Sequence, residues 1–240
     1  MKDAQDAKVR RALRMAGVQA GDCVLEIGCG WGALAEMATT AFDASVVGVT
    51  LSTEQLAWAQ ERLARVGAAE RADLRLQDYR DIGKTGAETF DAICSIEMVE
   101  AVGREYWPEY FQTVARLLKP GGRACIQSIV IADGLFERYI SSTDFIQQYI
   151  FPGGCLPSPT QFRAQAAAAG LEVVNEFSFG QDYARTLQLW REEFMAQESR
   201  VLQLGFDKRF IRIWEFYLAY CEAAFTQANT DVVQYTLRKA

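Results

Sequence analysis

The most informative feature of this 240-residue sequence is an absence, because it contains no histidine. A histidine general base, a Ser-His-Asp triad and any metal site that needs a histidine ligand are therefore excluded. Acid–base chemistry must fall to Glu, Asp, Tyr, Lys or a bound small ion. We expect no metal site and reduced thiols, because no C-x-x-C pair occurs among the six cysteines, which are Cys23, Cys29, Cys94, Cys125, Cys155 and Cys221.

Excess positive charge and long apolar runs are also missing. The 25 Lys and Arg residues are outnumbered by 31 Asp and Glu residues, which gives a net charge of −6. This balance disfavours nucleic acid as a partner. Residues 1–6 are polar and carry no apolar signal core, and no run approaches the roughly 20 apolar residues of a membrane span. We therefore expect a cytoplasmic protein that binds no nucleic acid.

The first half of the sequence alternates between short apolar runs and helical patterns. Strands are expected at 22–27, 45–50, 74–76, 90–96 and 123–131, and helices at 4–16, 33–41, 52–66 and 106–118. Nearly continuous apolar strands indicate a parallel α/β sheet with helices on both faces. In such Rossmann-like sheets the ligand binds at the carboxyl ends of the strands.

The pattern changes after Ile131. A helix near 159–169, a strand near 171–179 and a last, antiparallel strand at 232–237 complete the sheet. We predict one domain over 1–240, with helical insertions at 132–156 and 182–228 that cover the substrate. Two interpretations of the aromatic stripe in the second insertion remain open, core packing or a lid over an apolar cavity; its members are Phe210, Trp214, Tyr217, Leu218, Cys221 and Phe225.

A glycine-rich turn follows the first strand. Glu26, Gly28, Gly30 and Gly32 form a G-x-G-x-G pattern, which differs from the G-x-G-x-x-G fingerprint of dinucleotide sites. Glycines let the backbone approach a bulky ligand, and Glu26 can attract an ammonium or sulfonium group. A tight strand–helix turn without any ligand explains the glycines equally well.

The ends of the next strands favour a nucleoside ligand over an empty turn. Thr50 and Gln55 can reach a ribose, Asp78 can accept a hydrogen bond from an adenine amino group, and Tyr79 can stack on the ring. Three such sites at successive strand ends predict a nucleoside cofactor. The predicted cofactor residues beyond the turn are Thr50, Leu51, Gln55, Asp78, Tyr79 and Ile96.

Six segments carry a resemblance that spans essentially the whole chain: 24–32, 48–55, 76–81, 95–103, 149–158 and 182–187. They resemble the class I methyltransferases, and more closely the cyclopropane-fatty-acyl-phospholipid synthase family. The Tyr-Ile-Phe-Pro-Gly-Gly-Cys-Leu-Pro-Ser segment at 149–158 is absent from ordinary methyltransferases. The resemblance implies a seven-stranded sheet, S-adenosylmethionine as cofactor, and lipid biosynthesis by methyl transfer to the double bond of an unsaturated fatty acyl chain. The product would be a cyclopropane or methyl-branched fatty acid.

The resemblance also implies a base, a bound bicarbonate held by a cysteine, a glutamate, a histidine and a tyrosine. Glu100 matches the glutamate and Tyr183 the tyrosine, while Gln127 stands at the histidine position and the cysteine has no counterpart. A glutamine can donate to an anion but cannot carry its proton. Glu100, Tyr183 and Gln127 are the predicted catalytic residues, and bicarbonate is left open as a second cofactor.

Two other functions remain open. One is methyl transfer to an amine or an electron-rich carbon of a small molecule, and the other is non-catalytic binding of S-adenosylmethionine. We also expect a peripheral membrane contact through an exposed apolar rim of the insertions, and we leave a homodimer open.

Overall fold

The computed structural model describes residues 1–84, 86 and 88–239, whose strands form a seven-stranded sheet in the order β3-β2-β1-β4-β5-β7-β6. The first five strands are parallel, whereas β7 runs antiparallel to both β5 and β6. This confirms the predicted sheet. The strands are β1 (Cys23–Ile27), β2 (Ser45–Thr50), β3 (Ala72–Leu76), β4 (Phe90–Ile96), β5 (Leu118–Ile131), β6 (Leu171–Ser178) and β7 (Thr230–Lys239).

The predicted domain over 1–240 includes Thr85, Ala87 and Ala240, which lie outside the described residues. One strand boundary differs clearly from the expected one. The strand predicted at 123–131 begins already at Leu118, because Leu118 pairs with Phe90 of β4 before a bulge shifts the register. A Lys-Pro-Gly-Gly sequence therefore ends the preceding helix without ending the hydrogen bonding of the sheet.

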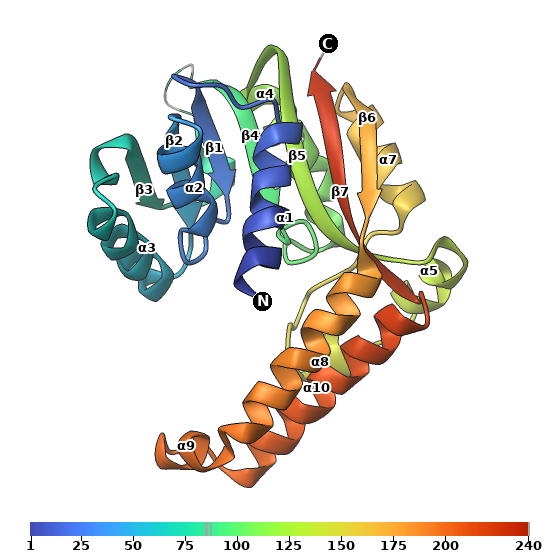
Figure 1. Ribbon diagram of the computed structural model, residues 1–240. Coiled ribbons are helices and arrows are strands. Elements are labelled where there is room, and N and C mark those ends of the chain that lie inside the picture. The colour runs from blue at the N-terminus through green and yellow to red at the C-terminus, as the bar shows by residue number, and fades with distance from the viewer. Residues whose placement is uncertain (85, 87, 240) are drawn as a thin grey trace.

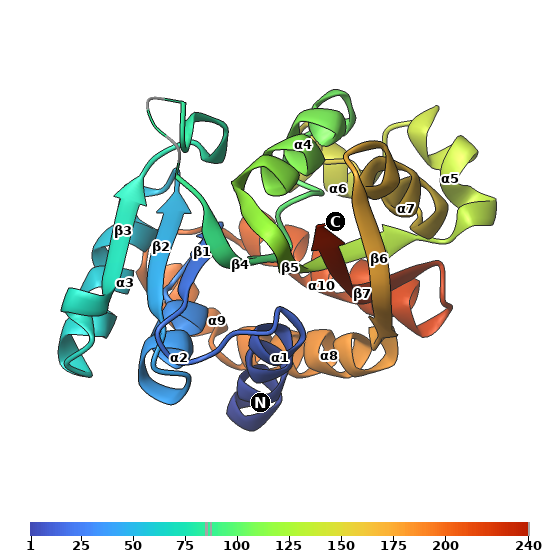
Figure 2. The same cartoon turned by 90° about the horizontal axis from the view of Figure 1, so that it is seen from above.

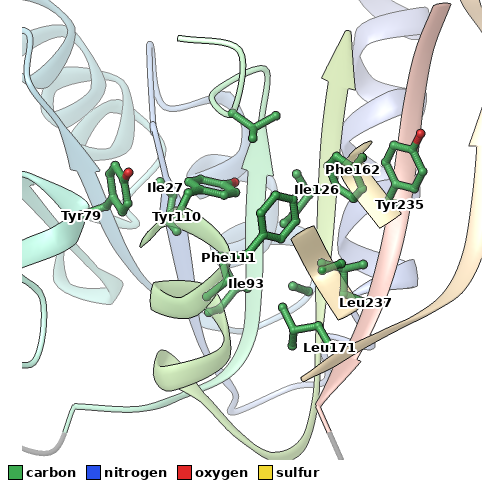
Figure 3. Close-up of a cluster of buried hydrophobic side chains, with 14 of the residues drawn as sticks. Ile27, Tyr79, Ile93, Tyr110, Phe111, Ile126, Phe162, Leu171, Tyr235 and Leu237 are labelled. Carbon is green, nitrogen blue, oxygen red and sulfur yellow. The ribbon is translucent and has the colours of Figure 1, made fainter. Parts of the chain in front are cut away.

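Helices cover both faces of the sheet (Figure 2). On one face α1, α2 and α3 pack over small apolar residues, and on the other α4 and α7 pack over a larger aromatic cluster (Figure 3). In that cluster the rings of Phe162 and Tyr235 stack with centroids 3.8 Å apart. The helices are α1 (Lys2–Met15), α2 (Ala33–Ala41), α3 (Thr53–Arg65), α4 (Trp107–Leu117) and α7 (Pro159–Ala168), with short 3-10 turns η1 (Ala69–Arg71), η2 (Tyr79–Asp81) and η3 (Arg104–Tyr106).

Both predicted insertions contain helices, and the second projects from the sheet as a long hairpin (Figure 1). Phe145 and Phe151 from the first insertion pack on Phe216 and Tyr217 of the second, with ring centroids 4.6 and 6.1 Å apart. The substrate-covering role of these helices stays a prediction. They are α5 (Asp133–Ile140) and α6 (Phe145–Tyr149) in the first insertion, and α8 (Gly180–Ala196), α9 (Glu198–Gln203) and α10 (Lys208–Thr226) in the hairpin.

The aromatic side chains of α10 lie in two different surroundings. Phe210 and Trp214 contact Phe194 of α8, which is packing within the hairpin. Phe216 is half exposed and contacts α6 instead.

Within the described part of the chain, no helix has the length and apolar character needed to cross a bilayer. All six cysteines are free thiols.

Candidate active site

A cavity of about 730 Å³ opens at the carboxyl ends of β1, β2 and β4. This is the edge at which parallel α/β sheets bind ligands, and the volume suits a nucleoside-sized molecule. Eight of the ten predicted cofactor residues line it, and Glu26 and Gly32 do not. The lining is Ile27, Gly28, Gly30, Val49, Thr50, Leu51, Ser52, Gln55, Gln77, Asp78, Tyr79, Arg80, Ile96, Glu97, Met98, Ala101, Val102 and Tyr106.

The glycines of the turn are required for different reasons. Gly28 has φ +81°, and a Cβ atom there would clash with the side chain of Met98, which also lines the cavity. Gly30 has φ +49°, and a Cβ atom there would meet no atom within 4 Å. A glycine is therefore required at position 28 because the Met98 side chain packs directly on the backbone. At Gly30 the backbone borders open space in which a ligand can lie.

Glu26 and Gly32 belong to the turn but do not line the cavity. Burial raises the pKa of Glu26 well above its usual range, while the backbone N–H of Ala35 and the charge of Arg62 oppose the rise. One oxygen of this carboxyl group has no hydrogen-bond partner among the described residues. A Cβ atom on Gly32 would lie 2.9 Å from that of Ala59 in α3. The attraction of Glu26 for a ligand cation stays a prediction.

Polar groups at the end of β2 are held by the start of α3. The Thr50 hydroxyl donates to Oε1 of Gln55 at 3.0 Å. The Ser52 side chain caps α3 by accepting the backbone N–H of Gln55 at 3.2 Å. The cap fixes Gln55 next to Thr50, and the contact of both residues with a ribose stays a prediction.

At the end of β3, Asp78 already has a partner. Arg80 donates to Asp78 through its backbone N–H at 2.9 Å and through its side chain at 3.0 and 2.6 Å, and this pairing lowers the pKa of the Asp78 carboxyl group. Tyr79 is mostly buried, with its ring edge-on to Tyr110 at 5.6 Å (Figure 3). Arg80 also lines the cavity, although it was not among the predicted cofactor residues.

Glu97, which the sequence did not single out, joins two of the predicted catalytic residues. The Tyr183 hydroxyl donates to Oε2 of Glu97 at 2.7 Å, and Nε2 of Gln127 donates to Oε1 at 2.7 Å. Glu97 follows β4 and lines the cavity. The structure therefore brings together residues from β5 and α8 around one carboxylate at the cavity wall. An acidic residue at a strand end was the only signal in the sequence.

The third predicted catalytic residue, Glu100, lies behind this wall. One carboxylate oxygen accepts the backbone N–H of Ile129, and the other is buried without a partner among the described residues. Burial, together with the charge of Glu97, raises the pKa of Glu100 to about 8. A carboxyl group that keeps its proton near neutral pH therefore lies directly behind the cavity wall. Within the described ranges, no cluster of His, Cys, Asp and Glu could hold a metal ion.

Comparison with known proteins gives a consistent set of matches. The family model described as mycolic acid cyclopropane synthetase matches residues 1–235. The chain is 44% identical over 236 residues to the tuberculostearic acid methyltransferase UfaA1 of Mycobacterium tuberculosis, covering 98% of this chain and 54% of that protein. It is 37% identical over 234 residues to the cyclopropane-fatty-acyl-phospholipid synthase of Escherichia coli K12, covering 98% and 58%.

A solved structure matches the fold over nearly the whole chain. The crystal structure of mycolic acid cyclopropane synthase CmaA1 complexed with SAH and CTAB superposes with a TM-score of 0.90 at 30% identity, covering 99% of this chain and 85% of that one. The chain spans little more than half the length of the two curated relatives. The similarity therefore applies to the part of those proteins that corresponds to this chain.

Proposed function

Since this chain belongs to the mycolic acid cyclopropane synthetase family, a family of class I methyltransferases, we propose that it transfers the methyl group of S-adenosylmethionine to the double bond of an unsaturated fatty acyl chain. The observation that carries the proposal is the cavity itself. Its glycine turn borders open space at one side, and its wall ends in the Glu97 carboxylate held by Gln127 and Tyr183. A cofactor site and a proton-accepting group therefore share one cavity.

The residues present fit S-adenosylmethionine. The space beside Gly30 is open, and the cavity volume of about 730 Å³ accommodates a nucleoside with its amino-acid tail. Gly28 and Gly30 would lie under the tail, Thr50 and Gln55 would face the ribose, and Asp78 would face the adenine. When bound, the cofactor supplies an electrophilic methyl group. The similarity to CmaA1, whose crystal structure contains SAH, supports this assignment.

The names of the relatives and the aromatic side chains near Glu97 support an acyl substrate. Tyr183 packs against Phe225 and Trp190, with ring centroids 5.0 and 6.3 Å apart. Methyl addition to a double bond leaves a positive charge on the second alkene carbon, and aromatic faces stabilise such a charge.

Bicarbonate, in contrast, does not fit the residues present. Of the three residues that the resemblance assigns to it, Gln127 and Tyr183 already donate to Glu97, and Glu100 accepts the backbone N–H of Ile129 behind the cavity wall. A second anion would also lie beside the Glu97 carboxylate, and like charges in a partly buried site repel strongly. The chain therefore needs no step through bicarbonate.

Contact with a lipid surface is part of the proposal. Figure 1 shows α9 at the far end of the helical hairpin. Leu202 of α9 and Leu204 and Phe206 directly after it are exposed, and Leu204 is 69% exposed. Exposed apolar side chains at a projecting tip suit a shallow, peripheral contact with a bilayer. We propose a cytoplasmic protein that meets its substrate there. A homodimer stays a prediction.

The test is incorporation of the methyl group. The purified chain is incubated with deuterium-labelled S-adenosylmethionine and vesicles of a monounsaturated phospholipid, and the fatty acids are analysed by mass spectrometry. Labelled fatty acids heavier by one methylene or methyl group support the proposal, and vesicles with saturated chains are the matched control. Label that enters only soluble amines would point to the small-molecule alternative. Cofactor binding without turnover on either substrate would indicate a non-catalytic protein.

A further inference from the structure

The Glu97 carboxylate occupies a position fixed from three sides. Its two oxygens accept from Gln127 of β5 and Tyr183 of α8, both at 2.7 Å. Its backbone N–H donates to the carbonyl of Gln127 at 2.8 Å. Its backbone has φ +57°, a left-handed conformation that is energetically costly for a residue with a side chain. The surrounding contacts hold the carboxylate at the cavity wall against this cost.

A chain of hydrogen bonds sets the direction of the Gln127 amide. Arg11 of α1 can only donate, and its Nη1 donates to Oε1 of Gln234 at 2.7 Å. The amide nitrogen of Gln234 must then face Oε1 of Gln127, to which it donates at 3.1 Å. The amide nitrogen of Gln127 is left to face Glu97. Because Gln127 and Gln234 are both 0% exposed, no water competes for these bonds.

We propose that the Glu97 carboxylate, held between Gln127 and Tyr183, is the proton acceptor of the reaction and takes the place of bicarbonate. The inference rests on the proposed methyl transfer and names the group that completes it. Glu97 lines the cavity, whereas Gln127, Tyr183 and Glu100 do not. It is therefore the member of the cluster that a substrate can reach. Gln127 and Tyr183 act through Glu97 and are positioning residues.

The step balances with Glu97 as base. The π electron pair of the double bond forms the new C–C bond to the methyl carbon, and the pair of the broken C–S bond stays on sulfur, which becomes a neutral thioether. The second alkene carbon is left as a cation. Glu97 then accepts one proton from the transferred methyl group, and the released C–H pair closes the three-membered ring onto the cation. The resulting carboxylic acid returns its proton to water.

Glu100 lies behind this base as a neutral carboxyl group. Its buried carboxyl group has a pKa of about 8, partly because of the charge on Glu97. With this pKa, Glu100 keeps its own proton near neutral pH and adds no second negative charge beside the Glu97 carboxylate.

The first experiment measures activity without carbon dioxide. Reactions are run in degassed buffer under argon, with and without added bicarbonate, on monounsaturated phospholipid vesicles. We expect wild-type turnover to change less than twofold on adding bicarbonate, and Glu97→Gln to lose at least about a hundredfold, the usual size of an acid–base contribution. Glu105→Gln, an exposed carboxylate of the same segment, should keep the wild-type rate. Turnover that depends on bicarbonate in the wild type overturns the inference.

A second experiment measures the binding of bicarbonate and does not depend on turnover. Each protein is saturated with S-adenosylhomocysteine and titrated with ¹³C-bicarbonate, observed by NMR. We expect no binding to the wild type and binding to Glu97→Ala, in which the two donors face an empty space. Bicarbonate or formate should also restore part of the activity of Glu97→Ala. Specific binding to the wild type contradicts the inference, whereas absence of lipid product from every protein contradicts the proposed function instead.

Arg11 provides a third variant that leaves the carboxylate in place. Arg11→Met removes the donor that sets the direction of the two amides, so Gln127 can turn its oxygen toward Glu97. We expect about a tenfold lower kcat with unchanged affinity for S-adenosylhomocysteine, and recovery in Arg11→Lys. Arg14→Met, an exposed position of the same helix, is the control. An equal loss of cofactor affinity would show that Arg11 acts only on the fold.

Discussion

Single residues in this protein carry roles that their neighbours of the same type do not. Gly28, Gly30 and Gly32 lie in one turn, yet only Gly30 has open space where a side chain would project. Glu97 and Glu100 lie three residues apart, yet one lines the cavity and the other is buried behind it. The surroundings, more than the residue type, decide the chemistry at each position.

Replacing Gly30 by valine tests the cofactor site. The side chain would fill the space assigned to the cofactor, so we expect at least about tenfold weaker binding of S-adenosylhomocysteine, measured by calorimetry. Gly21→Val is the control, because Gly21 also has positive φ and open space but lies outside the cavity. Equal loss of affinity in both variants would mean that backbone strain alone is responsible.

Replacing Glu100 by glutamine tests its raised pKa. The pKa of Glu100 is about 8 in the folded protein, whereas an unperturbed glutamate has a pKa of 4.5. Glu100 therefore binds its proton more tightly in the folded protein than in the unfolded chain. The resulting stability is present below about pH 4.5 and is lost as the pH rises through about 8. We expect the free energy of unfolding, from urea titrations, to fall less over this range in Glu100→Gln than in the wild type. Parallel curves would argue against the raised pKa.

At the scale of elements, the contact between the two insertions connects α6 to α10. Phe145 and Phe216 meet edge-on, with centroids 4.6 Å apart, and Phe216 remains half exposed. The short α6 is capped by Asp144, whose side chain accepts from Gln147. A five-residue helix with one cap depends on such packing to keep its place.

A double-mutant cycle measures this contact. We expect Phe145→Ala and Phe216→Ala to be non-additive by about 0.5–1.5 kcal/mol in the free energy of unfolding, as for other aromatic pairs. Phe206→Ala is the control partner for Phe145, because the Phe206 ring stacks on Phe210 instead. Additive effects for the first pair would contradict the docking of α6 on α10.

Apolar periodicity predicted most elements well. The helix 33–41 and the strands 45–50 and 90–96 have the boundaries expected from sequence, because apolar residues predominate in each of these segments. Strand β3 begins at Ala72, two residues earlier than predicted, since Ala72 and Asp73 join the sheet by pairing with Val46 and Val47. Tertiary pairing of this kind leaves no local pattern.

The site was predicted less completely than the fold. Glycine spacing and strand ends led to Gly28, Gly30, Thr50 and Gln55, because these positions follow from the sheet topology. Glu97 was not selected because its role depends on a left-handed backbone conformation and on partners from β5 and α8. Neither is encoded in local sequence preferences.

At the scale of the whole molecule, the net charge does not favour binding to a membrane, whereas the shape does. The net charge of −6 gives no general attraction to anionic lipid, while the projecting hairpin presents Leu204 and Phe206. Binding to a bilayer should therefore depend on the apolar tip and little on the lipid headgroup.

Vesicle sedimentation checks this expectation. Binding should not rise when anionic lipid replaces zwitterionic lipid, and it should fall about tenfold or more in the Leu204→Glu, Phe206→Glu double variant. Val66→Glu changes an exposed apolar residue at the end of α3 and should bind like the wild type. Stronger binding to anionic vesicles, or equal loss in the control, would exclude the tip as the contact.

The position of β7 has a consequence for biosynthesis. β6 pairs with β7 and with no other strand among the described residues, although the helical hairpin separates the two in the chain. At a translation rate of about 5–20 residues per second, β6 leaves the ribosome several seconds before the strand that pairs with it. During that interval its backbone edges are free to associate with other chains. Chaperones should therefore engage the nascent protein between the synthesis of β6 and that of β7.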